Sequence, residues 1–188
     1  MGTRDEFVER YVRAILDLPQ DARAALDIID DADVDLDGRV AACGVLMSVL
    51  QPGEPIPESF GPLALLDDAI LLRLAVDAAL PAEHPRRPAH MGKHPEFYDN
   101  LADDLAVARA FLGGCFVTLE QRLRKLGGME HKGRKASTIA DDDRASTWLF
   151  EEFDEAMTEA EIDEDQVVAS MRKLEQVVGH LRKRLPGR

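Results

Sequence analysis

The sequence is poor in the residues that several common functions require. Aromatic residues make up 5% of the 188 residues, and 23 basic residues stand against 36 acidic ones. The resulting net charge of −13 argues against nucleic acid as the main partner, because phosphate binding needs a basic surface. The scarcity of aromatic side chains also disfavours the stacking platforms that bind single-stranded nucleic acids.

The sequence also has little cysteine and no long apolar run. Its two cysteines, Cys43 and Cys115, lie in apolar surroundings at no zinc-site spacing, so we expect both to be reduced and buried. No run approaches the ~18 apolar residues of a membrane-spanning helix. The first residues lack the apolar segment of a signal peptide. These features predict a soluble, cytoplasmic protein without a transmembrane segment.

A proline-rich stretch, residues 52–62, separates two apolar segments of the sequence. The segment before it, up to Leu50, has apolar residues at helical spacing, and Pro52 ends that helix because proline disfavours helix at the preceding residue. The segment after it, residues 63–80, contains only four charged residues, which is typical of a helix buried on most sides. Those four residues are Asp67, Asp68, Arg73 and Asp77.

The proline-rich stretch resembles a known family. The run Pro52-x-Glu54-x-Ile56-Pro57-Glu58, followed at the family's spacing by Asp67-Asp68, is similar to the YkvA-like family, domain of unknown function 1232. Glutamates stand here where that family has aspartates, and Gly61 and Ala64 replace its more usual proline and glycine. The resemblance covers about residues 33–80. It implies a small helical module without a settled biochemical activity.

Four carboxylates in or just after this stretch, Glu54, Glu58, Asp67 and Asp68, form the main candidate site. Brought together, they would offer the oxygen ligands that Mg²⁺, Mn²⁺ or Ca²⁺ prefer. One of them with a raised pKa beside an ionised neighbour would also serve acid/base catalysis. The structural interpretation, which we prefer, is that they cap helices and accept hydrogen bonds from backbone amides of the turn. No motif calls for a cofactor, and we expect none.

An acidic turn precedes the first apolar segment. Asp33-x-Asp35-x-Asp37-Gly38 resembles the start of an EF-hand calcium loop, but Gly44 stands where the bidentate glutamate belongs. The alternative is a turn whose aspartates cap the next helix and complement its dipole.

Two further segments contain residues that bind ligands in other proteins. Residues 81–95 hold four prolines and predict a connecting loop, so the spacing of His90 and His94 does not indicate a helical metal site. Residues 122–135 are locally basic. They would hold a phosphate or an acidic partner, or would simply be a solvated helix end. The basic residues are Arg122, Arg124, Lys125, Lys132, Arg134 and Lys135.

The rest of the chain also shows helical periodicity and no strand-like alternation or hairpin turn. We predict an all-α fold: an irregular bundle of about six or seven helices in one domain, 1–188, with a C-terminal helical extension over about 96–185. Gly113-Gly114 should interrupt one helix, Asp163 should cap another, and Trp148 should lie in the core. Val167, Met171, Leu174, Val178, Leu181 and Leu185 should form one packing face.

Three classes of function remain open at this stage. We prefer a non-enzymatic interaction or regulatory module that binds an unknown protein partner, as a monomer or homodimer. The alternatives are a metal-dependent enzyme that uses the carboxylate cluster and a peripheral membrane protein, although the high acidity opposes anionic lipid.

Overall fold

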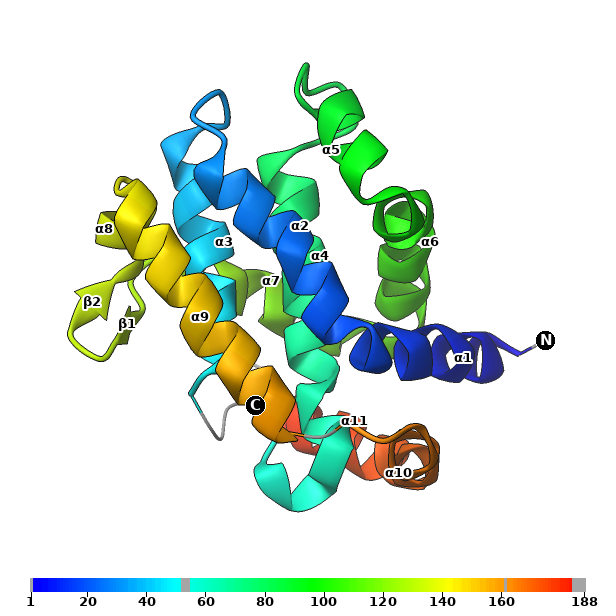
Figure 1. Cartoon of the computed structure of the whole chain (residues 1–188). Helices are drawn as coiled ribbons and strands as arrows, with labels where there is room; N and C mark the ends of the chain where they lie inside the picture. The colour runs from blue at the N-terminus through cyan, green and yellow to red at the C-terminus, as the bar shows by residue number, and fades with distance from the viewer. Residues whose placement is uncertain (1, 52–54, 161, 184–188) are drawn as a thin grey trace.

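The computed structural model describes residues 2–51, 55–160 and 162–183, with the backbone alone at residues 143 and 144. The all-α fold class is confirmed (Figure 1). The first half contains α1 (Thr3–Leu16), α2 (Leu18–Asp30), α3 (Leu36–Val49), η1 (Glu58–Leu65, a 3-10 helix), α4 (Leu66–Ala79), α5 (Arg87–Lys93) and α6 (Pro95–Leu112). The second half contains α7 (Gly114–Leu126), β1 (Glu130–His131), β2 (Arg134–Lys135), α8 (Ala136–Ile139), α9 (Asp143–Ala160), α10 (Glu164–Ser170), η2 (Met171–Lys173, a 3-10 helix) and α11 (Leu174–Arg182).

The apolar segment after the prolines is the central helix, as predicted. α4 contacts α1, α2, α3, α6 and α7 and lies behind α2 in Figure 1. Leu66, Ile70 and Leu74, which share one face, are 0%, 1% and 8% exposed. Because neighbours cover α4 on most sides, it has almost no polar face, as its composition indicates.

The start of α4 differs from the expectation. The sequence predicts a helix directly after Pro62, whereas residues 58–65 form the 3-10 helix η1 and the α-helix begins at Leu66. Gly61 has a positive φ of 66°, a conformation that glycine adopts without steric cost and that breaks regular helix geometry.

Two glycines allow α3 to approach its neighbours closely. A Cβ atom on Gly44 would overlap the backbone carbonyl of Leu126 at the end of α7, and one on Gly38 would lie 2.9 Å from the Cβ of Ala79 on α4. Gly44, the residue that breaks the calcium-loop pattern, is therefore a packing residue where two helices meet.

The structure contains more helices than the six or seven expected. One unexpected helix is α5, which occupies residues 87–93 of the predicted loop. Pro88 lies in its first turn, where the missing N–H costs nothing. Similarly, Pro19 lies in the first turn of α2, which begins at Leu18.

The prediction that the chain has no hairpin is wrong. β1 and β2 pair antiparallel through Glu130–Lys135 and His131–Arg134. Lys132 and Gly133 both have positive φ, 47° and 77°, as a two-residue hairpin turn requires.

The C-terminal part follows the predicted pattern. α6 and α7 are separated at Gly113, whose φ is 54°, and the Asp163 side chain accepts a hydrogen bond from the Gln166 amide at 2.9 Å. Leu185 lies outside the described residues. The other five residues of the predicted packing face are buried in the core.

The predicted burial is confirmed for the two cysteines but not for the tryptophan. Cys43 and Cys115 are free and buried, as expected. Trp148 is only half-buried, and the Arg134 guanidinium lies over its ring at 4.3 Å from the centroid. A basic side chain thus covers the aromatic ring that was expected in the core.

Candidate functional site

The carboxylates predicted as a metal or acid/base cluster have different environments. Glu58 is exposed at the start of η1, whereas Asp67 and Asp68 are buried in the first turn of α4, 2% and 8% exposed. Glu54 lies outside the described residues, so the complete set of four is not tested. Among the residues that the structure describes, no three His, Cys, Asp or Glu side chains are grouped closely enough to hold a metal ion.

Asp67 and Asp68 lie beside Ser48 of α3 and Arg122 of α7. Burial, and then the charge of Asp68, raise the pKa of Asp67 well above its ordinary value, and burial raises the pKa of Asp68 to about 7. The positive charge of Arg122 opposes both shifts. Oδ2 of Asp67 and Nε of Arg122 are both buried without a hydrogen-bond partner.

Ser48 of α3 is the hydrogen-bond partner of Asp68. The Ser48 hydroxyl donates to the carbonyl of Val45 at 2.9 Å and lies 3.4 Å from Oδ1 of Asp68. The Ser48 hydroxyl thus gives Asp68 a long second hydrogen bond, which opposes the rise in the pKa of Asp68. The positive charge beside the pair is that of Arg122.

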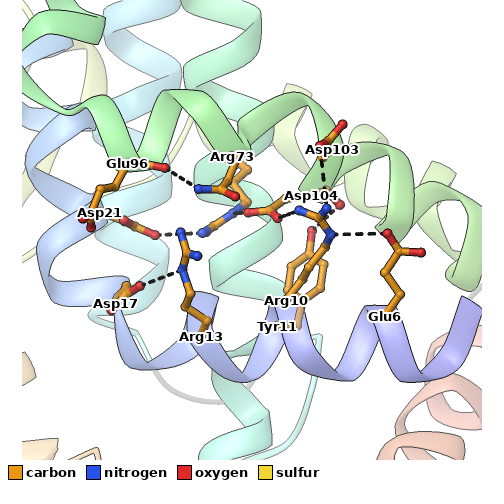
Figure 2. Close-up of polar contacts among 11 residues, drawn as sticks. Glu6, Arg10, Tyr11, Arg13, Asp17, Asp21, Arg73, Glu96, Asp103 and Asp104 are labelled. Atoms are coloured by element: carbon orange, nitrogen blue, oxygen red, sulfur yellow. Dashed lines mark hydrogen bonds and ion pairs between the residues drawn. The ribbon is translucent and has the colours of Figure 1, made fainter. Parts of the chain in front are cut away.

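Arg73 instead joins a buried ionic network between four helices, which we call the Arg73 network (Figure 2). Its Nη2 donates to Asp21 of α2 at 2.8 Å and its Nε donates to Asp104 of α6 at 2.9 Å. Arg10 of α1 donates to the other oxygen of Asp104 at 3.0 Å, and the Tyr11 hydroxyl donates to the Asp104 carbonyl at 3.1 Å.

The charges of the Arg73 network balance. Two guanidinium groups face two carboxylates, which is the condition for burying charge. Even so, burial raises the pKa of Asp21 to about 6, against the lowering effect of Arg73. The only sequence signal for this network is a single arginine in an apolar helix, since the sequence gives no indication of where its partners lie.

Two histidines of the predicted loop, His90 and His94, pair with carboxylates at the C-terminal end of α2. His90 Nε2 lies 2.8 Å from Asp31, and His94 Nε2 lies 2.8 Å from Asp27. Asp31 also accepts from Arg86 at 2.8 Å. Although burial opposes it, the hydrogen bonds of His90 and Arg86 lower the pKa of Asp31 to about 2. The two histidines and their two carboxylate partners are each four residues apart, and the two pairs join the C-terminal end of α5 to that of α2.

The aspartates of the acidic turn before α3 were expected to cap that helix, but the side chain of its N-cap residue does not. Asp35 is the N-cap residue of α3, but its side chain makes no capping hydrogen bond. Asp33, Asp35 and Asp37 are exposed, and a long 3.6 Å ion pair joins Asp33 to Arg86. The partly buried contacts of this turn belong to Asp31, a residue outside the calcium pattern.

The six predicted basic residues do not share one environment. Arg122 is half-buried beside the Asp67–Asp68 pair, Lys132 forms an ion pair with Glu152, and Arg134 covers Trp148. Lys132 and Arg134 are exposed, as are the remaining three, Arg124, Lys125 and Lys135.

The sequence did not predict a groove between α2 and α9, two helices that lie side by side in Figure 1. This α2–α9 groove has a volume of about 420 Å³ and is lined by Arg23, Leu26, Asp27, Asp30, His94, Ser146, Thr147 and Phe150. Leu26 and Phe150 provide its large apolar surfaces, and the Phe150 side chain is 38% exposed. Carboxylates one turn apart on α2 border it.

Within the described ranges, no helix is at once long enough and apolar enough to cross a lipid bilayer. Comparison of the chain with protein-family models, curated proteins and solved structures found no match.

Proposed function

We propose that the chain is a non-enzymatic interaction or regulatory module that binds a partner protein segment in the α2–α9 groove. The partner segment carries a bulky apolar side chain beside lysine or arginine residues. The observation that carries this proposal is the exposed Phe150 ring beside Leu26, bordered by the carboxylates of Asp27 and Asp30.

Charge complementarity defines the partner further. The chain has a net charge of −13, so a basic segment would be attracted over a long range before it docks. Asp27 and Asp30 lie toward one end of the groove-lining part of α2, and Arg23 lies toward the other. A basic residue of the partner belongs at the end with the carboxylates.

The positions of the reactive side chains support a binding role over an enzymatic one. Asp67 and Asp68 are 2% and 8% exposed, so a substrate would reach them only after the packing around α4 opened. The resemblance of residues 33–80 to the YkvA-like family, which implies a small helical module, is consistent with a binding role.

A selection from a random peptide library displayed on phage tests the proposal. Enriched peptides should contain a bulky apolar residue next to lysine or arginine, and synthetic versions should bind the wild-type chain in calorimetry. Phe150→Asp should weaken that binding by about tenfold or more, because a charge would replace the apolar anchor.

Val168→Asp is the matched control, since Val168 is 51% exposed on α10, away from the groove. It should leave peptide binding unchanged. Peptides that bind Phe150→Asp as tightly as wild type would contradict the proposal, and so would a selection without a basic and apolar consensus. Circular dichroism of each variant establishes that it is folded.

A further inference from the structure

A second hollow, which we call the polar cavity, lies where the end of α1, the start of α2 and the junction of α5 and α6 meet. Its volume is about 260 Å³, and Arg73 and Asp21 are part of its wall. Figure 2 shows Asp17, Asp21 and Glu96 gathered on one side of the Arg13 and Arg73 guanidinium groups. The charged lining residues are Arg13, Asp17, Asp21, Arg73, Lys93 and Glu96.

The inner wall of the polar cavity is rigid. Arg73 and Asp21 are 5% and 7% exposed and hydrogen-bond to each other, and Arg73 also bonds to Asp104. The ring of Phe97 lies against Arg73, with the guanidinium carbon 5.4 Å from its centroid. Groups held in this way need little ordering when a ligand binds.

The rim of the polar cavity has weak ion pairs that a ligand would replace. Arg13 lies 3.4 Å from Asp17, with side chains 56% and 49% exposed, and Lys93 lies 3.3 Å from Asp27. Exposed pairs of this kind contribute little to stability. Their cations and carboxylates are therefore available to a ligand at small cost.

The lining residues carry three basic side chains and three carboxylates. Arg73 and Asp21 already pair with each other, which leaves two basic and two acidic side chains at the rim. A ligand with one sign of charge would face two of these four with like charge. We propose that the polar cavity binds a small zwitterion of the α-amino acid class. Arg13 and Lys93 attract its carboxylate, and Asp17 and Glu96 attract its ammonium group.

The size of the cavity restricts the ligand. A volume of 260 Å³ is below the usual range for drug-sized ligands, so the cavity suits a molecule as small as an amino acid. Phe97 and Pro95 offer apolar surface to the side chain of the ligand. This site goes beyond the proposed function and does not depend on the α2–α9 groove, with which it shares only His94.

The common L-amino acids, each titrated separately into the full chain labelled with ¹⁵N, test the proposal. At least one should shift the backbone amides of Glu96 and Phe97 and the side-chain amides of Gln20 and Asn100. The deaminated acid and the decarboxylated amine made from the best ligand should each bind about tenfold more weakly or worse.

Two rim variants and three controls complete the experiment. Arg13→Gln and Glu96→Gln, both exposed, should each weaken amino acid binding by about tenfold. Arg4→Gln on α1 and Asp103→Asn on α6 lie outside the cavity lining and should have no effect. Phe150→Asp should also have no effect, which separates this test from that of the groove.

Three results would overturn the proposal. In the first, no amino acid of the panel shifts these amides. In the second, an analogue with a single charge binds as tightly as the amino acid from which it is made. In the third, neither rim variant weakens the binding.

Discussion

The Arg73 guanidinium on α4 and the Asp21 carboxylate on α2 meet at 2.8 Å, with less than a tenth of either side chain exposed. The two residues lie 52 positions apart in the sequence. Asp104 lies 2.9 Å from Nε of the same guanidinium. One arginine therefore fixes the relative positions of α2, α4 and α6.

Removing this arginine should destabilise the protein strongly. Arg73→Met leaves the buried Asp21 without a countercharge and Asp104 with Arg10 alone, and breaking buried ion pairs in this way costs about 3–5 kcal/mol. The loss in free energy of unfolding, measured with urea, should be larger at neutral pH than in mild acid, where the carboxylates take up protons.

Arg4→Met is the control for this prediction. Arg4 forms an exposed 3.9 Å pair with Glu175, and surface pairs contribute at most about 1 kcal/mol. Equal losses in the two variants would show that burial of the Arg73 network has no energetic consequence.

The buried Asp67–Asp68 pair should make the protein more stable in mild acid than at neutral pH. The pKa of Asp68 is raised from 3.8 to about 7, so in this range the folded protein keeps a proton that the unfolded chain has released. The free energy of unfolding should therefore fall as pH rises from about 4 to about 7, by up to ~1.4 kcal/mol per pH unit for one proton. Asp21, with its pKa raised to about 6, contributes in the same direction.

Urea unfolding at a series of pH values measures this slope. Asp68→Asn should make the slope shallower, since the amide does not titrate, while Asp103→Asn, exposed on α6, should leave it unchanged. A slope in Asp68→Asn as steep as in wild type would show that Asp68 is not the group that titrates.

Added Mg²⁺ or Mn²⁺ should leave the melting temperature unchanged. Arg122 already supplies a positive charge beside Asp67 and Asp68, and Glu58 is exposed. Differential scanning fluorimetry with and without metal measures this. A rise of several degrees that Asp67→Asn abolishes would instead support the metal site predicted from the sequence.

Adding one methyl group at Gly44 should destabilise the protein. A Cβ atom there overlaps the Leu126 carbonyl, so α3 and α7 would have to separate, and overpacking of this kind costs about 1–3 kcal/mol. Gly179 on α11 has open space around its Cβ position, so Gly179→Ala should stabilise by about 0.4–1 kcal/mol. Chemical denaturation of both variants measures the difference, and equal effects would rule out close packing at Gly44.

The features predicted correctly from the sequence depend on local patterns. The burial of Ile70 follows from the apolar composition of its own helix, and the Asp163 cap follows from residues three positions apart. The helix break at Gly113 is similarly local. Each prediction needs only neighbouring residues, and tertiary contacts did not override it.

The features that were missed have two physical causes. α5 was missed because Pro88 was counted among the prolines of a loop, whereas proline suits the first turn of a helix. The hairpin was missed because its strands have two residues each, which is too short for a strand-like alternation. The contacts of Arg73 and His94, and the α2–α9 groove, form between distant segments. Residue spacing along the chain does not indicate which of these segments pack together.

Alkylation of the two buried thiols, Cys43 and Cys115, would report local opening of the folded protein. Burial raises the pKa of Cys43 to about 12 and also raises that of Cys115, so neither forms the reactive thiolate readily in the folded state. Alkylation then proceeds only through transient exposure. Cys43 belongs to α3, whereas Cys115, 3.9 Å from the Val178 carbonyl, lies against α11. Their separate labelling rates would therefore show whether the C-terminal helix detaches before the central helices open.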